Sequence, residues 1–335
     1  MACVRTWNCR ERLTGADGPC FSPRRTNFEL SLPGPGGELL TVEHQDSPGP
    51  ALRVKKTYKL YIGGEFVRTE SGRYDPIESA KTGFLANVSR GSRKDLREAV
   101  RKAREAQPGW AGKSAYLKGQ ILYRMAEMLE GRADSFAKLL AETRGLPPAA
   151  ARREVRASID RLVHYAGWSD KFGALLGTVN PVASSYFDFS VPEPMGVVGV
   201  VAPEKPDLLG LVSHLAPVIV AGNAAVVLLS ESYPLASLEL AEVLATSDLP
   251  AGVANLISGR KEELVPHLAR HMDVQAIADA SGDSALSKAI GEDAAVNVKR
   301  VKLYAAADYF SEKAQGLDFI EAFVEIKTTW HPIGV

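Results

Sequence analysis

The chain has 335 residues, of which 45% are hydrophobic and 24% are charged, and 40 basic residues balance 40 acidic ones. These proportions are typical of a soluble globular protein, and the balanced charge gives no reason to expect binding to nucleic acid or to a membrane surface. No apolar run approaches the length of a membrane-spanning helix.

Residues 1–54 mix Pro, Gly, Arg and Ser without periodicity, which predicts a disordered tail. Its arginines are compatible with a transit peptide, but Glu11 and Asp17 interrupt them; a mis-chosen start codon would give the same pattern. All three cysteines, Cys3, Cys9 and Cys20, lie here. An odd, terminal set fits a reducing compartment, so we expect a cytoplasmic protein with no thiol nucleophile in its folded part.

Residues 55–180 are predicted to form a hairpin followed by helices that pack on a sheet. Alternating runs flank Gly63-Gly64 between Lys59 and Val67, which is a two-residue hairpin signal. Capping residues and apolar faces predict the helices, at 92–107, 114–130, 134–143 and 149–172.

Residues 181–304 alternate short apolar runs with segments of helical length. Runs this short and this uniformly apolar are typical of strands buried on both faces of a parallel sheet. The strands are predicted at 196–202, 224–229, 254–257, 276–280 and 298–304, and the helices at 208–220, 234–247, 262–271 and 284–292. The fold class is therefore α/β, with a doubly wound, Rossmann-like parallel sheet and an N-terminal helical layer.

Residues 305–335 are interpreted as a linker and a terminal strand, Phe323 to Trp330. This segment alternates apolar and polar residues, so we expect one of its faces to be covered. Another strand-like run begins at Tyr186. Because the terminal strand has no evident partner in the parallel sheet, it is a candidate for pairing with another chain.

Doubly wound sheets bind ligands beyond the carboxyl ends of their strands. The loops to examine are thus 203–207, 230–233, the turn at Gly259 and 281–283. No metal site is expected, since His267 and His271 are the only histidines four residues apart and lack a third ligand nearby.

Across the predicted folded part, a series of motifs resembles the aldehyde dehydrogenase superfamily. They include YIGGEFV, AETRG, EPMGVVGVVAP, LAPVIVAGNAAVV, LPAGVANLISG and EIKTTWHPIG. The chain most resembles the degenerate second unit of the family-16 aldehyde dehydrogenases, or a free-standing bacterial relative of that unit. This resemblance implies an oligomerisation hairpin at 186–200 and a C-terminal oligomerisation strand.

The resemblance also implies which catalytic groups are absent. The family uses a cysteine thiolate, a carboxylate that activates water and an amide that stabilises the oxyanion. The oxyanion amide is replaced by Lys205, and the segment that carries the general base reads Tyr304 to Asp308. Soon afterwards the sequence already resembles the family's C-terminal tail, so we expect no catalytic residue and no catalytic domain.

A vestigial cofactor site is implied at Pro203, Lys205, Ser230, Glu231, Gly259 and Gly282. A lysine that holds the ribose in the family is replaced by Leu228, and Asp283 places a negative charge beside the phosphates, so no NAD(P) or only weak NAD(P) binding is expected. A Glu after a strand, as Glu231 is, is more often a solvated side chain, and Gly282 is equally compatible with a simple turn. Lys205 is expected to form an ordinary surface pair with its neighbour Glu204, and His214, within a helix, is expected to be a packing or surface residue.

Two functions remain open. The first is a non-catalytic partner that forms a homo-oligomer, or a hetero-oligomer with a full-length aldehyde dehydrogenase. The alternative is an NAD(P)-dependent oxidoreductase, active alone or completed by another chain's catalytic domain.

Overall fold

A seven-stranded sheet runs through the computed structural model, which describes residues 55–79, 83–304 and 308–334. The predicted tail, residues 1–54, lies outside the described residues. In spatial order the strands are β12 (Arg300–Leu303), β11 (Ala276–Asp279), β8 (Val197–Val201), β9 (Ala224–Leu228), β10 (Ala254–Ile257), β2 (Leu60–Ile62) and β3 (Glu65–Val67). The first five are parallel, and β2 and β3 form the predicted antiparallel hairpin. The doubly wound fold is confirmed.

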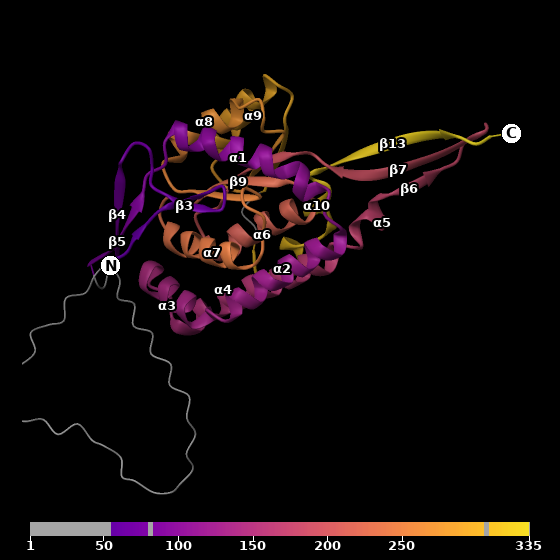
Figure 1. The fold of residues 1–335 in the computed structure, drawn as a ribbon. Helices are drawn as coiled ribbons and strands as arrows, with labels where there is room; N and C mark the ends of the chain where they lie inside the picture. The colour runs from indigo at the N-terminus through magenta and orange to yellow at the C-terminus, as the bar shows by residue number, and fades with distance from the viewer. Residues whose placement is uncertain (1–54, 80–82, 305–307, 335) are drawn as a thin grey trace, which may run out of the picture. The chain divides into compact units, whose positions relative to one another are not determined.

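Helices cover both faces of this sheet (Figure 1). On one face lie α1 (Arg93–Ala111), α8 (Lys261–Arg270) and α9 (Ser284–Ala295), and on the other lie α6 (Asp207–Val220) and α7 (Pro234–Thr246). Neighbouring residues of β8 point to opposite cores: Val198 and Val200 pack with α6, whereas Val197 and Val201 pack with α1 and α8. This burial on both sides explains why the two central strands, β8 and β9, carry no polar side chain.

An outer layer of helices packs over α6 and α7. It consists of α2 (Ala115–Glu130), α3 (Ala133–Arg144) and α4 (Pro148–Trp168). The helix expected to reach residue 172 ends at Trp168, and a turn leads into α5 (Phe172–Leu176), so that expectation was wrong. The turn buries Ser169 against α2, where a Cβ on Gly119 would lie 2.4 Å from the Ser169 hydroxyl oxygen. Among the described residues, no helix is long and apolar enough to cross a bilayer.

A second, three-stranded sheet was not predicted. It is built from β1 (Thr57–Tyr58), β5 (Gly83–Ser89) and β4 (Tyr74–Ser79). Pro76 lies inside β4, and a proline within a short run argues against a strand. The strand tolerates Pro76 because, among the described strands, β4 lies at the edge of its sheet and pairs with β5 alone.

The third sheet, here called the extension, projects from the α/β body (Figure 1). It comprises β13 (Val324–Pro332), β7 (Tyr186–Pro194) and β6 (Thr178–Asn180), all antiparallel, with β7 in the middle. The terminal strand is thus confirmed, and within the single chain its apolar side is uncovered: Ile326 and Trp330 are 51% and 55% exposed. Pairing with β7 satisfies the backbone groups on one edge of β13 and leaves these side chains uncovered.

Between β12 and β13 the chain folds back over α6. This segment contains a 3-10 turn (Glu312–Ala314) and α10 (Leu317–Glu321). It buries Tyr309, Phe319 and Ile320. This segment therefore covers part of the core beside α6, and it leads into β13 of the extension.

Candidate functional site

The order of the strands reverses beside β8, which lies between β9 and β11. Loops leaving β8 and β11 diverge at such a point and leave a crevice for a ligand. A hollow of about 480 Å³ lies there, lined by residues that include Pro203, Lys205, Tyr233, Gly282 and Tyr309. Three of the six residues predicted for the site are thus brought together.

The loop after β8 carries two predicted site residues with different environments. Pro203 is buried, and its ring occupies the space that a side chain at Gly210 of α6 would need, with its Cγ 2.4 Å from the Cβ position. Lys205 is exposed, and its ammonium lies 4.9 Å from the centroid of the Tyr233 ring. Lys205 was expected to form a surface pair with Glu204, and that expectation was wrong.

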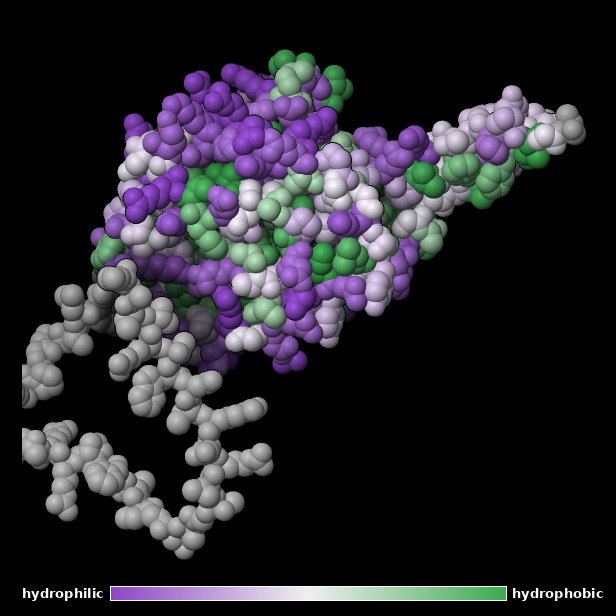
Figure 2. Space-filling view, viewed as in Figure 1, coloured by the Kyte–Doolittle hydropathy of each residue, from purple (hydrophilic) through white to green (hydrophobic). Residues whose placement is uncertain are grey.

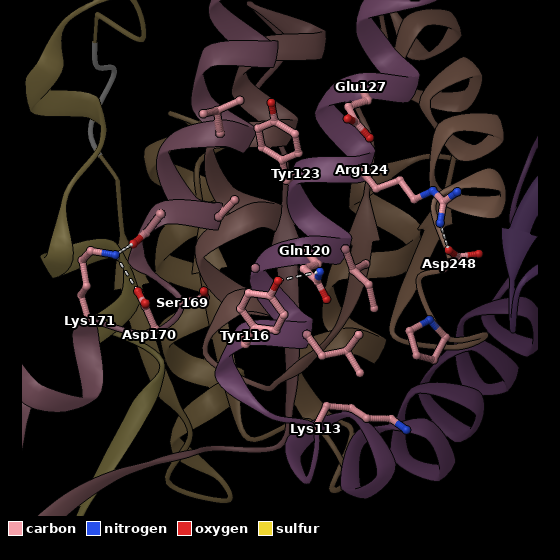
Figure 3. Close-up of a pocket in the computed structure, with 17 residues that line it drawn as sticks. Lys113, Tyr116, Gln120, Tyr123, Arg124, Glu127, Ser169, Asp170, Lys171 and Asp248 are labelled. Carbon is pink, nitrogen blue, oxygen red and sulfur yellow. Dashed lines mark hydrogen bonds and ion pairs between the residues drawn. The ribbon is translucent and has the colours of Figure 1, made fainter.

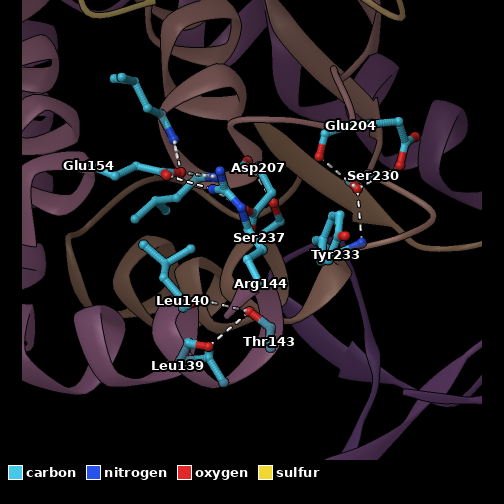
Figure 4. Close-up of polar contacts among 12 residues, drawn as sticks. Leu139, Leu140, Thr143, Arg144, Glu154, Glu204, Asp207, Ser230, Tyr233 and Ser237 are labelled. Carbon is cyan, nitrogen blue, oxygen red and sulfur yellow. Dashed lines mark hydrogen bonds and ion pairs between the residues drawn. The ribbon is translucent and has the colours of Figure 1, made fainter. Parts of the chain in front are cut away.

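Glu204 instead turns toward the loop after β9 (Figure 4). Its Oε2 accepts hydrogen bonds from the Ser230 hydroxyl at 2.8 Å and from the Ser232 N–H at 3.0 Å. Its Oε1 accepts from the Glu231 N–H at 3.2 Å and from the Lys261 ammonium at 2.5 Å. Burial alone would raise the pKa of Glu204, but Lys261 and the other donors lower that pKa to about 2. The Glu204 carboxylate is therefore ionised at neutral pH, and its hydrogen bonds hold it in one position.

Ser230, Glu231 and Gly259 share a second, smaller hollow of about 150 Å³. Glu231 is not simply solvated: its Oε1 accepts a hydrogen bond from the Lys261 N–H at 2.5 Å at the start of α8, and its Oε2 lies 3.6 Å from the Arg260 guanidinium. Gly259 has φ of 153°, and a Cβ there would lie 3.2 Å from the backbone of Gly91. These three residues close the edge of the sheet between β9 and β10.

Gly282 lies in the loop that leads from β11 into α9, with φ of 70° and open space around its Cβ position. Next to it, Asp283 caps α9 by accepting hydrogen bonds from the N–H groups of Ala285 at 2.9 Å and Leu286 at 3.2 Å. A hollow of about 490 Å³ between α8 and α9 is lined by Asp283, Glu231 and Glu204, among others. Its acidic rim is unfavourable for a phosphate.

Lys261 is the site residue that sequence reasoning missed. Its side chain is 8% exposed, and its ammonium donates to the Ala202 carbonyl at 2.7 Å as well as to Glu204. The strand order could have predicted this contact, because the loops that follow parallel strands all lie at the carboxyl edge of the sheet. Glu204 follows β8 and Lys261 follows β10, so opposite charges face each other across the end of β9.

An aromatic cluster borders the switch-point crevice through Tyr309. His214 of α6 is buried, its Nε2 lies 3.0 Å from the Tyr309 hydroxyl, and its ring centroid lies 4.5 Å from that of Tyr304. Burial, and then the charge of Arg161, lowers the pKa of His214 to about 3. Burial raises the pKa of Tyr304, whose hydroxyl has no hydrogen-bond partner among the described residues. Neither group titrates near neutral pH, so the cluster is suited to packing rather than to proton transfer.

A larger hollow, of about 830 Å³, lies between α2 and α4 (Figure 3). No predicted site residue lines it. Its polar side chains pair with one another, as Arg124 does with Asp248 and as Gln120 does with Tyr116. Nowhere in the described ranges do three or more His, Cys, Asp or Glu side chains gather in a way that would hold a metal ion.

Comparisons with known proteins agree with this geometry. The sequence profile of the aldehyde dehydrogenase family matches residues 66–307. Retinal dehydrogenase 2 of Mus musculus is 30% identical over 289 residues, which are 83% of this chain and 55% of that protein. Cytosolic aldehyde dehydrogenase 1 of Elephantulus edwardii is 31% identical over 265 residues, which are 77% of this chain and 52% of that protein.

Among solved structures, the NAD⁺ complex of an aldehyde dehydrogenase from Bacillus cereus matches with a TM-score of 0.71 and 26% identity, over 74% of this chain and 50% of that one. The chain thus spans about half the length of the relatives that it matches. The matched half includes the parallel sheet, its covering helices and the crevice at the switch point. This chain is a member of the aldehyde dehydrogenase family.

Proposed function

We propose that this chain is a non-catalytic, cytoplasmic member of its family that acts through assembly, either with a second copy of itself or with a full-length aldehyde dehydrogenase. The observation that carries the proposal is the extension, which presents uncovered apolar side chains on a hydrogen-bonded sheet. Green residues gather along it in the surface view (Figure 2). Exposed apolar patches of this kind are typical of protein–protein contact surfaces.

Both faces of the extension contribute to this surface. Antiparallel register places Ile326 and Trp330 of β13 on one face, whereas Phe187 and Val191 of β7 lie on the other. All four side chains are more than a third exposed. The outer edge of β13 has no pairing strand among the residues described by the structure, so its backbone groups are also open to a partner strand.

Polar contacts inside the extension support a preformed surface rather than a loose one. Asn180 donates to Asp188 at 2.9 Å and to the Ser190 hydroxyl at 3.0 Å. Ser190 and Thr328 share a hydrogen bond of 2.8 Å across β7 and β13. A rigid sheet loses little conformational entropy when a partner binds, which favours assembly.

The absence of catalysis is proposed from the residues at the crevice. Lys205 stands where the resemblance places the oxyanion amide, and its ammonium is directed to the Tyr233 ring. Tyr304, which begins the segment where the resemblance places the general base, packs in the aromatic cluster with His214 and Phe319. No cysteine follows Cys20 in the sequence, so no thiol is available within the residues that the structure describes.

The test is light scattering on the full chain, alone and mixed with a full-length dehydrogenase. The double variant Ile326→Glu with Trp330→Glu should lower the assembled mass to that of a monomer while circular dichroism stays unchanged. Tyr123→Glu on α2 is the matched control, since Tyr123 is 52% exposed but lies far from the extension in sequence, and it should assemble as the wild type does. A wild-type chain that remains monomeric alone and in the mixture would contradict the proposal.

A second candidate is an NAD(P)-dependent oxidoreductase completed by a partner's catalytic domain. It is favoured by the two hollows at the carboxyl edge, of about 480 and 490 Å³, which lie where dinucleotides bind in sheets of this type. Formation of NAD(P)H that requires both this chain and an inactive partner variant would support it. An unchanged rate on adding this chain would argue against it.

A further inference from the structure

We infer that the carboxyl edge of the sheet contains an anion-binding cradle that Glu204 fills from within, so that the carboxylate takes the place of a ligand's phosphate group. The cradle is defined here as the Ser230 hydroxyl, the N–H groups of Glu231 and Ser232, and the Lys261 ammonium. All four donors converge on one carboxylate, at distances between 2.5 and 3.2 Å. The inference rests on the proposed function, since a carboxylate in this position opposes the binding of a cofactor that contains phosphate.

The donors are held in place by contacts that do not involve the Glu204 carboxylate. The Ser230 Oγ accepts from the Tyr233 N–H at 3.0 Å, as Figure 4 shows. The Lys261 ammonium donates to the Ala202 carbonyl, and the Lys261 N–H donates to Glu231. A variant that lacks the Glu204 carboxylate would therefore keep the cradle but leave it without an anion. Within the described part of the chain, the Ser230 hydroxyl would keep only the Glu204 backbone carbonyl, at 3.3 Å, as an acceptor, and the Lys261 ammonium only the Ala202 carbonyl.

Lys261 gives the cradle its preference for an anion. Its side chain is 8% exposed, and apart from Glu204 its ammonium contacts only a carbonyl oxygen among the described residues. A buried cation without a counter-charge is costly in free energy. Removal of Glu204 therefore makes the binding of another anion beside Lys261 favourable. Backbone N–H groups beside an ammonium are also the donors that phosphate-binding loops use.

Glu204 also stands between two hollows. It lines both the switch-point hollow of about 480 Å³ and the hollow of about 490 Å³ between α8 and α9. Its side chain is 37% exposed, so the carboxylate lies at the surface of the crevice rather than beneath it. A dinucleotide that lies across the ends of the strands would have to displace the Glu204 side chain, and its phosphates would be repelled by the Glu204 carboxylate. The chemistry of the ligand is therefore a phosphate, either free or within a dinucleotide.

The experiment measures binding of inorganic phosphate and of NAD, separately, by titration calorimetry on the full chain. Glu204→Ala should bind at least one of the two probes by roughly tenfold or more tighter than the wild type, because the internal competitor is gone. Glu204→Gln, which keeps the volume but not the charge, should show a smaller gain. Adding Lys261→Met to Glu204→Ala should abolish the gain, and circular dichroism with thermal melts identifies any variant that fails to fold.

The outcomes separate the sources of the ligand. A gain for phosphate alone identifies a free-phosphate cradle, whereas a gain for NAD identifies a closed dinucleotide crevice. A folded Glu204→Ala protein that binds neither probe more tightly than the wild type would overturn the inference, as would a gain that survives Lys261→Met. Light scattering of the same variant tests the proposed assembly independently, so either idea can fail without the other.

Discussion

Buried titratable side chains connect the sequence most directly to a measurable property of this molecule. His214 faces Tyr304, Tyr309 and the charge of Arg161, and its Nδ1 has no hydrogen-bond partner among the described residues. The histidine in the middle of a predicted helix was expected to be a packing or surface residue, and it is a packing residue. The folded protein therefore favours the neutral form of the His214 imidazole.

Acid should therefore destabilise the protein through His214. Its pKa is about 3 in the folded chain and about 6.5 in the unfolded chain, so stability is fully present above the unfolded value. Below that value the unfolded chain binds a proton that the folded chain does not bind. The free energy of unfolding therefore falls by about 2 kcal/mol by about pH 5. Urea titrations near pH 7 and near pH 5 should show that His214→Gln loses this part of the pH dependence.

The control for this prediction is His331→Gln, since His331 is exposed on β13. That variant should keep the pH dependence of the wild type. Equal pH dependence in the wild type and in His214→Gln would show that the buried imidazole is not responsible.

For individual residues of the candidate site, the sequence predicted which positions take part but not which side chains contact one another. Ser230, Glu231 and Gly259 do meet at the edge of the sheet, because parallel strands end together there. Glu204 was assigned to its chain neighbour Lys205, whereas its partner is Lys261, 57 residues away. Proximity in sequence favoured the wrong lysine, since only the strand order shows which loops adjoin.

Elements are held together by one buried ionic group at the base of the helical layer. Arg144 at the end of α3 contacts Glu154 of α4 at 2.5 Å and Asp207 of α6 at 2.8 Å (Figure 4). Glu154 also accepts a hydrogen bond from the Leu208 N–H at 3.3 Å, at the start of α6. Burial and the charge of Glu154 raise the pKa of Asp207 to about 7, although Arg144 opposes this shift. Three helices thus depend on a single guanidinium.

Arg144→Met should lower the free energy of unfolding by about 3–5 kcal/mol, because two buried carboxyl groups would lose the cation that they share. Arg124→Met is the matched control. It removes an ion pair with Asp248 in which both side chains are more than half exposed, and it should cost less than about 1 kcal/mol. Urea unfolding of both variants gives the comparison, and equal losses would contradict the role of the buried group.

The elements that sequence reasoning predicted well are those with a strong period or a uniform apolar run. The parallel strands and the helices over residues 93–144 fall in this class. The β4–β5 hairpin was missed because Pro76 and exposed residues obscure its alternation. The end of α4 at Trp168 was missed because it depends on the close contact between Gly119 and Ser169, which belongs to tertiary packing.

For the molecule as a whole, we predict no oxidation of aldehydes by the isolated chain. Assays with NAD and with NADP on aliphatic and aromatic aldehydes should show no reduced cofactor above the rate without protein. The variant in which Cys3, Cys9 and Cys20 are all replaced by Ser is the control for stray thiol chemistry. Turnover by that variant would show that another nucleophile operates, and the non-catalytic proposal would then have to be abandoned.

The position of the extension in the chain also constrains how the molecule folds. Ser190 and Thr328, which are hydrogen-bonded across β7 and β13, are 138 positions apart, and all five parallel strands lie between them in the sequence. Contacts between such distant residues must close a long loop, and they form more slowly than the local contacts within helices. The strand pair should therefore be completed only on chains whose central sheet already exists. A partner that recognises this pair would select folded subunits and ignore nascent or misfolded ones.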